Sequence, residues 1–186
     1  MFIFTFWACM PVLVSEGLTD WVQPENDWEM NIPPADTVEE GFRVGETPLD
    51  LRMIDQHGKD VSLWQFYGQI VLLDVSAEWC APCRLLAEDT EHTYLEYKDD
   101  GFMYLTLLAE DEYSQLPSQE VLDEWANEYS ITAPVLADTI DHRPQLVPTG
   151  AYPRLILINQ DMKVEKANIT PAEDSRIREE IEKLIK

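Results

Sequence analysis

The feature that most restricts the fold of this chain is the run at residues 70–76, Ile-Val-Leu-Leu-Asp-Val-Ser, which is apolar and β-branched almost throughout. A strand with one face in water alternates apolar and polar residues, whereas a strand buried on both faces is apolar along its length. The run therefore predicts a strand inside a sheet, with a layer of structure packed on each side.

The segments around this run alternate between strand-like and helix-like patterns. Thr170 and Glu173 are expected to form a capping box at the start of the last helix. The order predicts an α/β fold, a three-layer sandwich with a mixed central sheet, helices on both faces and an N-terminal hairpin extension. The hairpin is predicted at residues 49–54 and 61–64, helices at 82–97 and after Ser118, and further strands at 102–108, 134–137, 153–158 and 164–169, the last two antiparallel.

The first 15 residues are interpreted as a hydrophobic leader. Its apolar part, residues 2–14, is shorter than the roughly 18–20 residues of a membrane-spanning helix but matches the roughly 7–15 residues of a secretory signal. Cys9 follows Ala8 and resembles the lipid acceptor of a bacterial lipoprotein signal, which would anchor the chain to a membrane. The alternative is a leader that happens to hold a cysteine.

Residues 16–42 hold eight acidic side chains and three prolines without a helical or strand period. We interpret them as an extended tether that precedes a folded domain at residues 43–186. Trp21 and Trp28 are unusual in a tether, and we expect them to pack either on the domain or on a partner.

The charge of the chain excludes two classes of partner. Its 13 basic residues stand against 36 acidic ones, a formal net charge of −23. Nucleic acid and anionic lipid headgroups are both gripped by Lys and Arg, so neither is expected to bind. Three cysteines are also too few for a disulfide framework.

Cys80 and Cys83 are separated by two residues at the predicted junction of strand and helix. The unpaired N–H groups and the dipole at a helix N-terminus stabilise a thiolate at Cys80. Cys83 lies one turn further on, close enough to form a disulfide with Cys80. Arg84 should favour the thiolate and Glu78 should oppose it. We interpret the pair as a redox dithiol, with Cys80 as the nucleophile and Cys83 as the resolving thiol.

Two other uses of this spacing stay open. A structural zinc site needs four ligands, and the sequence has neither a second Cys-x-x-Cys nor a paired histidine motif. No metal site is therefore predicted. A static disulfide would need no further residues.

The stretch at residues 71–84, which contains Trp-Cys-Ala-Pro-Cys, resembles the active-site strand and loop of thioredoxin-like proteins. The resemblance implies that Asp74 is buried beneath the second cysteine as its proton acceptor, and that Trp79 shields the site. It also implies that Pro153 is a cis-proline opposite the cysteines, where the backbone of Tyr152 docks a substrate chain.

The residues before this strand, with Gly-Glu-Thr-Pro at 45–48, are similar to the start of TlpA/ResA-type proteins, which are membrane-anchored thiol–disulfide oxidoreductases outside the cytoplasm. The resemblance implies a monomeric protein disulfide reductase, rather than an oxidase, that needs no cofactor. Its partners would be protein thiols and disulfides, such as apocytochrome c, and an upstream electron donor. The alternative function is a tethered binding module or chaperone with a static disulfide.

Peroxide chemistry on the same fold is excluded by two positions. Peroxiredoxins carry Pro, and Thr or Ser, seven and three residues before the reactive cysteine. This chain has Leu73 and Ala77 there.

Overall fold

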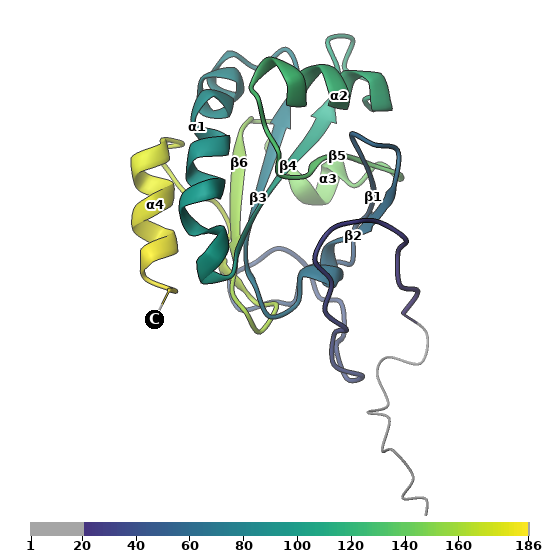
Figure 1. The fold of residues 1–186 in the computed structure, drawn as a ribbon, viewed down its shortest axis with the longest axis vertical. Helices are drawn as coiled ribbons and strands as arrows, with labels where there is room; N and C mark the ends of the chain where they lie inside the picture. The colour runs from purple at the N-terminus through teal and green to yellow at the C-terminus, as the bar shows by residue number, and fades with distance from the viewer. Residues whose placement is uncertain (1–20, 186) are drawn as a thin grey trace, which may run out of the picture.

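A computed structural model of the chain describes residues 21–185 (Figure 1). The predicted leader, with Cys9, lies outside the described residues, so lipidation and anchoring stay predictions. Among the described helices, none has both the length and the apolar character that crossing a membrane requires.

Within residues 21–185 the strands form one seven-stranded sheet in the order β2-β1-β5-β4-β3-β6-β7. The strand β3 pairs in parallel with β4 and antiparallel with β6. The strands β4 and β5 are parallel, and the β1–β2 and β6–β7 pairs are antiparallel, so the sheet is mixed as predicted. The strands are β1 (Arg52–Asp55), β2 (Asp60–Ser62), β3 (Ile70–Ala77), β4 (Phe102–Glu110), β5 (Val135–Asp138), β6 (Arg154–Ile158) and β7 (Val164–Lys166).

Helices cover the two faces of the sheet unequally. One face packs against α1 (Ala81–Tyr97), α2 (Gln119–Glu128) and α4 (Asp174–Glu182), and α1 and α4 lie side by side (Figure 1). The other face is covered by the 3-10 helix η1 (Leu63–Phe66), by the short helix α3 (Arg143–Leu146) and by the N-terminal segment. A second 3-10 helix, η2 (Lys98–Asp100), leads from α1 into β4. The predicted α/β three-layer sandwich is confirmed.

All eight residues of β3 are buried, as the continuous apolar run predicted. Leu72 packs in the core beneath α1, α2 and α4, whereas the next residue, Leu73, packs in the core on the opposite face. The alternation along β3 therefore decides which of its side chains can lie near the helix that carries the cysteines.

The predicted start of the last helix is wrong. The helix α4 begins at Asp174, with Glu173 as its N-cap, and the Thr170–Pro171 peptide bond is cis. Ile169 is buried, and its N–H donates to Leu155 O at 2.9 Å. This contact keeps the chain extended past β7, so the capping pattern has no helix to cap at Thr170.

The segment at residues 21–42 lies along the domain. The Nε1 of Trp21 donates to Asp50 Oδ2 at 3.1 Å, and that of Trp28 donates to Asp55 Oδ2 at 2.7 Å. Both tryptophans therefore pack on the domain, which was the first of the two expectations. The boundaries of the tether and of the domain at residues 43–186 stay predictions.

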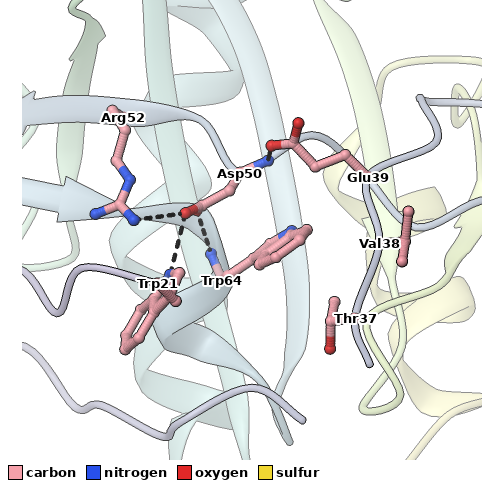
Figure 2. Close-up of a pocket in the computed structure, with 7 residues that line it drawn as sticks. All are labelled: Trp21, Thr37, Val38, Glu39, Asp50, Arg52 and Trp64. Atoms are coloured by element: carbon pink, nitrogen blue, oxygen red, sulfur yellow. Dashed lines mark hydrogen bonds and ion pairs between the residues drawn. The ribbon is translucent and has the colours of Figure 1, made fainter. Parts of the chain in front are cut away.

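Asp50 occupies the centre of a shallow hollow between this segment and the β1–β2 hairpin (Figure 2). Its two oxygens take four donors, namely Trp21 Nε1, Ser62 Oγ, the backbone N–H of Trp64 and the guanidinium of Arg52. A carboxylate offers about four lone-pair positions. We therefore interpret the hollow as a structural junction and not as a ligand site.

Candidate functional site

The predicted junction of strand and helix is where the structure places both cysteines. The strand β3 ends at Ala77 and α1 begins at Ala81, so Cys80 is the N-cap of α1. Pro82 occupies the first turn of α1. Backbone N–H groups in the first turn have no partner within the helix, so the missing N–H of proline costs no hydrogen bond there. The N–H of Cys83 donates to Cys80 Sγ at 3.3 Å. The helix N-terminus thus directs a donor at the sulfur of the first cysteine.

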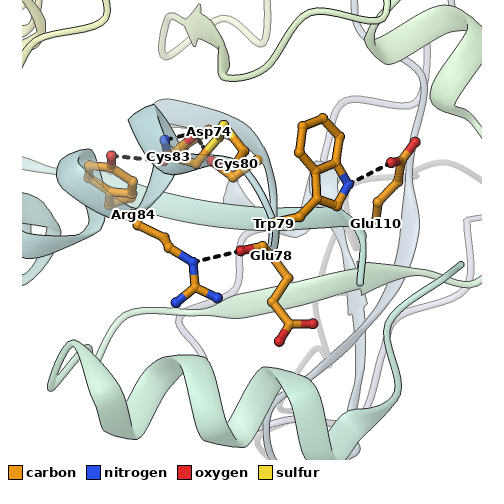
Figure 3. Close-up of a disulfide and its surroundings, with 9 residues drawn as sticks. Asp74, Glu78, Trp79, Cys80, Cys83, Arg84 and Glu110 are labelled. Carbon is orange, nitrogen blue, oxygen red and sulfur yellow. Dashed lines mark hydrogen bonds between the residues drawn. A yellow bond between two sulfur atoms is a disulfide. The ribbon is translucent and has the colours of Figure 1, made fainter. Parts of the chain in front are cut away.

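Cys80 and Cys83 form a disulfide, with their Cα atoms 5.2 Å apart (Figure 3). The structure therefore describes the oxidised form. Cys80 is 3% exposed and Cys83 is 1% exposed, whereas Trp79, immediately before them, is 49% exposed. Among residues 21–185 no group of three or more His, Cys, Asp and Glu side chains is arranged to hold a metal ion. The zinc alternative gains no support there.

Asp74 lies on β3 and is 2% exposed. Asp74 follows Leu72 by two residues on the strand and so points to the same face, towards the helical layer of α1. Two hydroxyl groups donate to its carboxylate, Ser76 Oγ to Oδ1 at 2.7 Å and Tyr104 Oη to Oδ2 at 3.2 Å. Burial raises the pKa of Asp74 to about 6, although the hydrogen bonds from Ser76 and Tyr104 act in the opposite direction. A carboxyl with such a pKa can exchange a proton near neutral pH.

The Tyr152–Pro153 peptide bond is cis, as the resemblance implied. The strand β6 begins at the next residue, Arg154, which pairs with Val75 of β3. This register places Pro153 beside the end of β3, from which the loop to Cys80 departs. The ring of Tyr152 meets that of Trp79 edge to face, with the ring centroids 5.7 Å apart. The predicted site residues from the two loops are therefore brought together.

Arg84 and Glu78 both have other partners in the oxidised structure, and their expected effects on the Cys80 thiolate stay predictions. Its Nε donates to Glu78 O at 2.8 Å, its guanidinium lies over the ring of Trp125, and Nη1 is 3.6 Å from Glu128 Oε1. The carboxylate of Glu78 accepts from the backbone N–H of Glu112. Each charge is thus engaged by neighbours other than the sulfur of Cys80.

Glu110, the last residue of β4, is a site residue that the sequence did not reveal. Its carboxylate accepts from Trp79 Nε1 at 2.9 Å (Figure 3). It also accepts from Tyr152 Oη at 3.2 Å, and Arg143 Nη1 is 3.3 Å from it. The signal available in the sequence was the polar residue that ends the apolar run at 102–109. Because β4 is parallel to β3, its last residue lies at the same edge of the sheet as the loop that carries Cys80, although the register that brings Glu110 opposite Ala77 is irregular.

Comparisons with known proteins agree with this arrangement. The model of the AhpC/TSA family matches residues 44–167. The thiol-disulfide oxidoreductase ResA of Oceanobacillus iheyensis is 26% identical over 131 residues, which are 67% of this chain and 64% of that protein. The chain thus spans slightly less than two thirds of the length of that relative.

Two solved structures are similar in fold. One is a Chlorobium tepidum protein described as the thiol:disulfide interchange protein DsbE, with a TM-score of 0.64, 22% identity, and coverage of 77% of this chain and 99% of that chain. The other is the thioredoxin domain of a thiol-disulfide oxidoreductase from Bacteroides vulgatus, with a TM-score of 0.63, 21% identity, and coverage of 77% and 99%. At these identities the likeness shows the fold, which is thioredoxin-like.

Proposed function

The chain belongs to the AhpC/TSA family and is of the thioredoxin-like TlpA/ResA type, and on that premise we propose that it is a thiol–disulfide oxidoreductase acting through Cys80 and Cys83. The observation that supports this most is the closed disulfide at the N-terminus of α1. A helix N-terminus favours the thiolate that disulfide exchange requires.

The reduced pair would transfer two electrons in two exchange steps. The Cys80 thiolate attacks one sulfur of a partner disulfide, which forms a mixed disulfide and releases the other partner sulfur as a thiolate. Asp74 then accepts the proton of Cys83, and the resulting thiolate attacks Cys80 Sγ. This step closes the Cys80–Cys83 disulfide and releases the partner in its dithiol form. An upstream dithiol restores the pair by the reverse sequence.

Each neighbouring residue has a distinct part in this proposal. Asp74, with its pKa near 6, is the proton acceptor for Cys83. An extended segment of the partner would bind to the backbone of Tyr152, next to Pro153, as a short strand does. Trp79, half exposed beside the pair, would contact the same segment.

The direction and the location of the activity are further parts of the proposal. We propose a reductase that works outside the cytoplasm, on the grounds of the TlpA/ResA resemblance and the leader at residues 1–15. Protein disulfides, with apocytochrome c as one substrate, and an upstream electron donor are the proposed partners. A reductase should have a redox potential nearer to about −270 mV than to about −120 mV. Equilibration with glutathione buffers would measure it.

Insulin reduction with dithiothreitol as the donor tests the activity. The wild-type protein and Cys9→Ser should both turn over, whereas Cys80→Ala should be inactive. Cys83→Ser should accumulate a mixed disulfide through Cys80, and Cys80→Ser should not. A protein without turnover, in which Cys80→Ala changes nothing, would instead support the static disulfide of a binding module.

Alkylation of the reduced protein tests the order of the two thiols. Cys80 should react with iodoacetamide at pH 7 faster than Cys83, because only the first sulfur faces the helix N-terminus as an N-cap. If Cys80 proved inert after reduction, the assignment of the nucleophile would be wrong.

A further inference from the structure

The carboxylate of Glu110 joins the two loops that border the disulfide. Trp79 immediately precedes Cys80, and Tyr152 immediately precedes the cis-proline. Both donate to the same carboxylate, Trp79 Nε1 to Oε2 (Figure 3) and Tyr152 Oη to Oε1. Their rings also touch edge to face. One side chain of β4 therefore fixes the separation of the two residues that flank the entry to the redox pair.

Further contacts hold the carboxylate itself in place. The Nη1 of Arg143, at the start of α3, lies 3.3 Å from Glu110 Oε1 and donates to Ser114 O at 3.2 Å. The backbone of Glu110 is held too, because its carbonyl accepts from the N–H of Glu78 at 2.9 Å. The Glu110 side chain is 16% exposed, and Trp79, which donates to it, is 49% exposed. The carboxylate is thus fixed before any partner arrives.

We infer that Glu110 is a positioning residue for the partner chain. It acts through Trp79 and Tyr152, which it holds so that the backbone at residue 152 stays aligned with Cys80. This inference rests on the proposed function, because it concerns how the same site receives its substrate. A surface that is ordered in advance loses less conformational entropy on binding.

The inference separates two kinds of substrate. A protein disulfide uses both the sulfur chemistry and the docking backbone, whereas a small disulfide uses the sulfur chemistry alone. Loss of Glu110 should therefore weaken the binding of a protein disulfide and leave the reaction of a small disulfide almost unchanged.

The experiment compares Glu110→Ala with Glu112→Ala in the full chain. Glu112 carries the same charge two residues further on, and its contact with Glu78 uses its backbone N–H. For insulin, Glu110→Ala should raise KM about 10-fold with kcat changed less than about twofold. For oxidised glutathione, kcat/KM should change less than about twofold. Glu112→Ala should alter neither substrate.

A double variant tests whether Glu110 acts through Tyr152. Tyr152→Phe removes only the hydroxyl, so Glu110→Ala combined with Tyr152→Phe should raise KM no more than Glu110→Ala alone. Additive effects would overturn the inference. So would equal losses on insulin and on oxidised glutathione, since these would place Glu110 in the chemistry, or a KM for insulin that stays unchanged.

Tryptophan fluorescence provides a readout that does not depend on turnover. Glu110→Ala should shift the emission of the wild-type protein, because the indole N–H of Trp79 loses its acceptor, and it should not shift that of Trp79→Phe. If the emission shifts but neither substrate is reduced, Glu110 does bind Trp79 as described and the proposed function fails. If turnover is normal and the emission does not shift, the inference fails while the proposed function stands.

Discussion

Replacing Asp74 by asparagine should stabilise the oxidised protein at neutral pH by an amount that disappears in acid. In the unfolded chain this carboxyl would ionise near its ordinary pKa of 3.8, whereas in the fold its pKa is about 6. Between these values the folded state holds a proton that the unfolded state has lost. The contribution of Asp74 to stability is therefore complete below about pH 4 and is lost as the pH rises through 6.

The size of the effect follows from the shift. About two pKa units correspond to about 3 kcal/mol, which is the free energy by which the fold disfavours the ionised carboxyl relative to the protonated one. Asparagine has nearly the same shape and cannot ionise. Relative to the wild type, Asp74→Asn should therefore gain about 3 kcal/mol in its free energy of unfolding between pH 4 and pH 8.

Urea unfolding of both oxidised proteins across this pH range measures the difference. All other titrating groups are shared, so they cancel when the two proteins are compared at each pH. Glu112→Gln, which removes a carboxylate at an exposed position of the neighbouring loop, serves as the control. A difference between Asp74→Asn and the wild type that stays flat from pH 4 to pH 8 would show that the buried carboxyl does not titrate as described.

Two other substitutions give sharp expectations. Tyr104→Phe removes a hydroxyl that donates to Asp74, so the pKa of Asp74 should rise above about 6. The infrared band of the Asp74 carboxyl, followed against pH, measures this pKa. An unchanged or lower pKa would contradict the role of the hydroxyl. Arg154→Met should lower the free energy of unfolding by about 3 kcal/mol, because this guanidinium donates to the backbone carbonyls of residues 42, 145, 146 and 167. Arg43→Met, at an exposed ion pair, should change the free energy of unfolding by less than about 0.5 kcal/mol. Urea unfolding measures both variants. Equal losses for Arg154→Met and Arg43→Met would show that the carbonyl contacts of Arg154 contribute little.

Much of the fold could be predicted because its central elements are encoded by local patterns. The run at residues 70–76 became β3, and α1 begins within one residue of the predicted start. The last helix could not be placed in the same way. Its capping pattern at Thr170 is a local signal too, but the burial of Ile169 and its bond to the backbone of β6 prevail over it. Tertiary contacts can therefore override the helix start that a local capping pattern predicts.

In the candidate site too, some residues follow from local patterns and others from tertiary contacts. Cys80 and Cys83 lie one helical turn apart, so the four-residue segment that holds them suggests a disulfide, and the surrounding stretch at residues 71–84 carries the resemblance that implies a redox role. Glu110 is 31 residues from Trp79 and 42 residues from Tyr152. Its place also depends on an irregularity in the pairing of β3 with β4, where the register shifts so that Ala77 pairs with Glu110.

A shift of one residue in register turns the following side chain to the other face of the sheet. The position of such a shift cannot be predicted from a periodic pattern in the sequence. The chemistry proposed for the cysteines is therefore carried by a local motif, whereas the contacts proposed to select the partner depend on how distant segments meet. Exchanging Glu110 tests that separation more directly than exchanging either cysteine, because it should alter which disulfides are accepted and leave the exchange reaction intact.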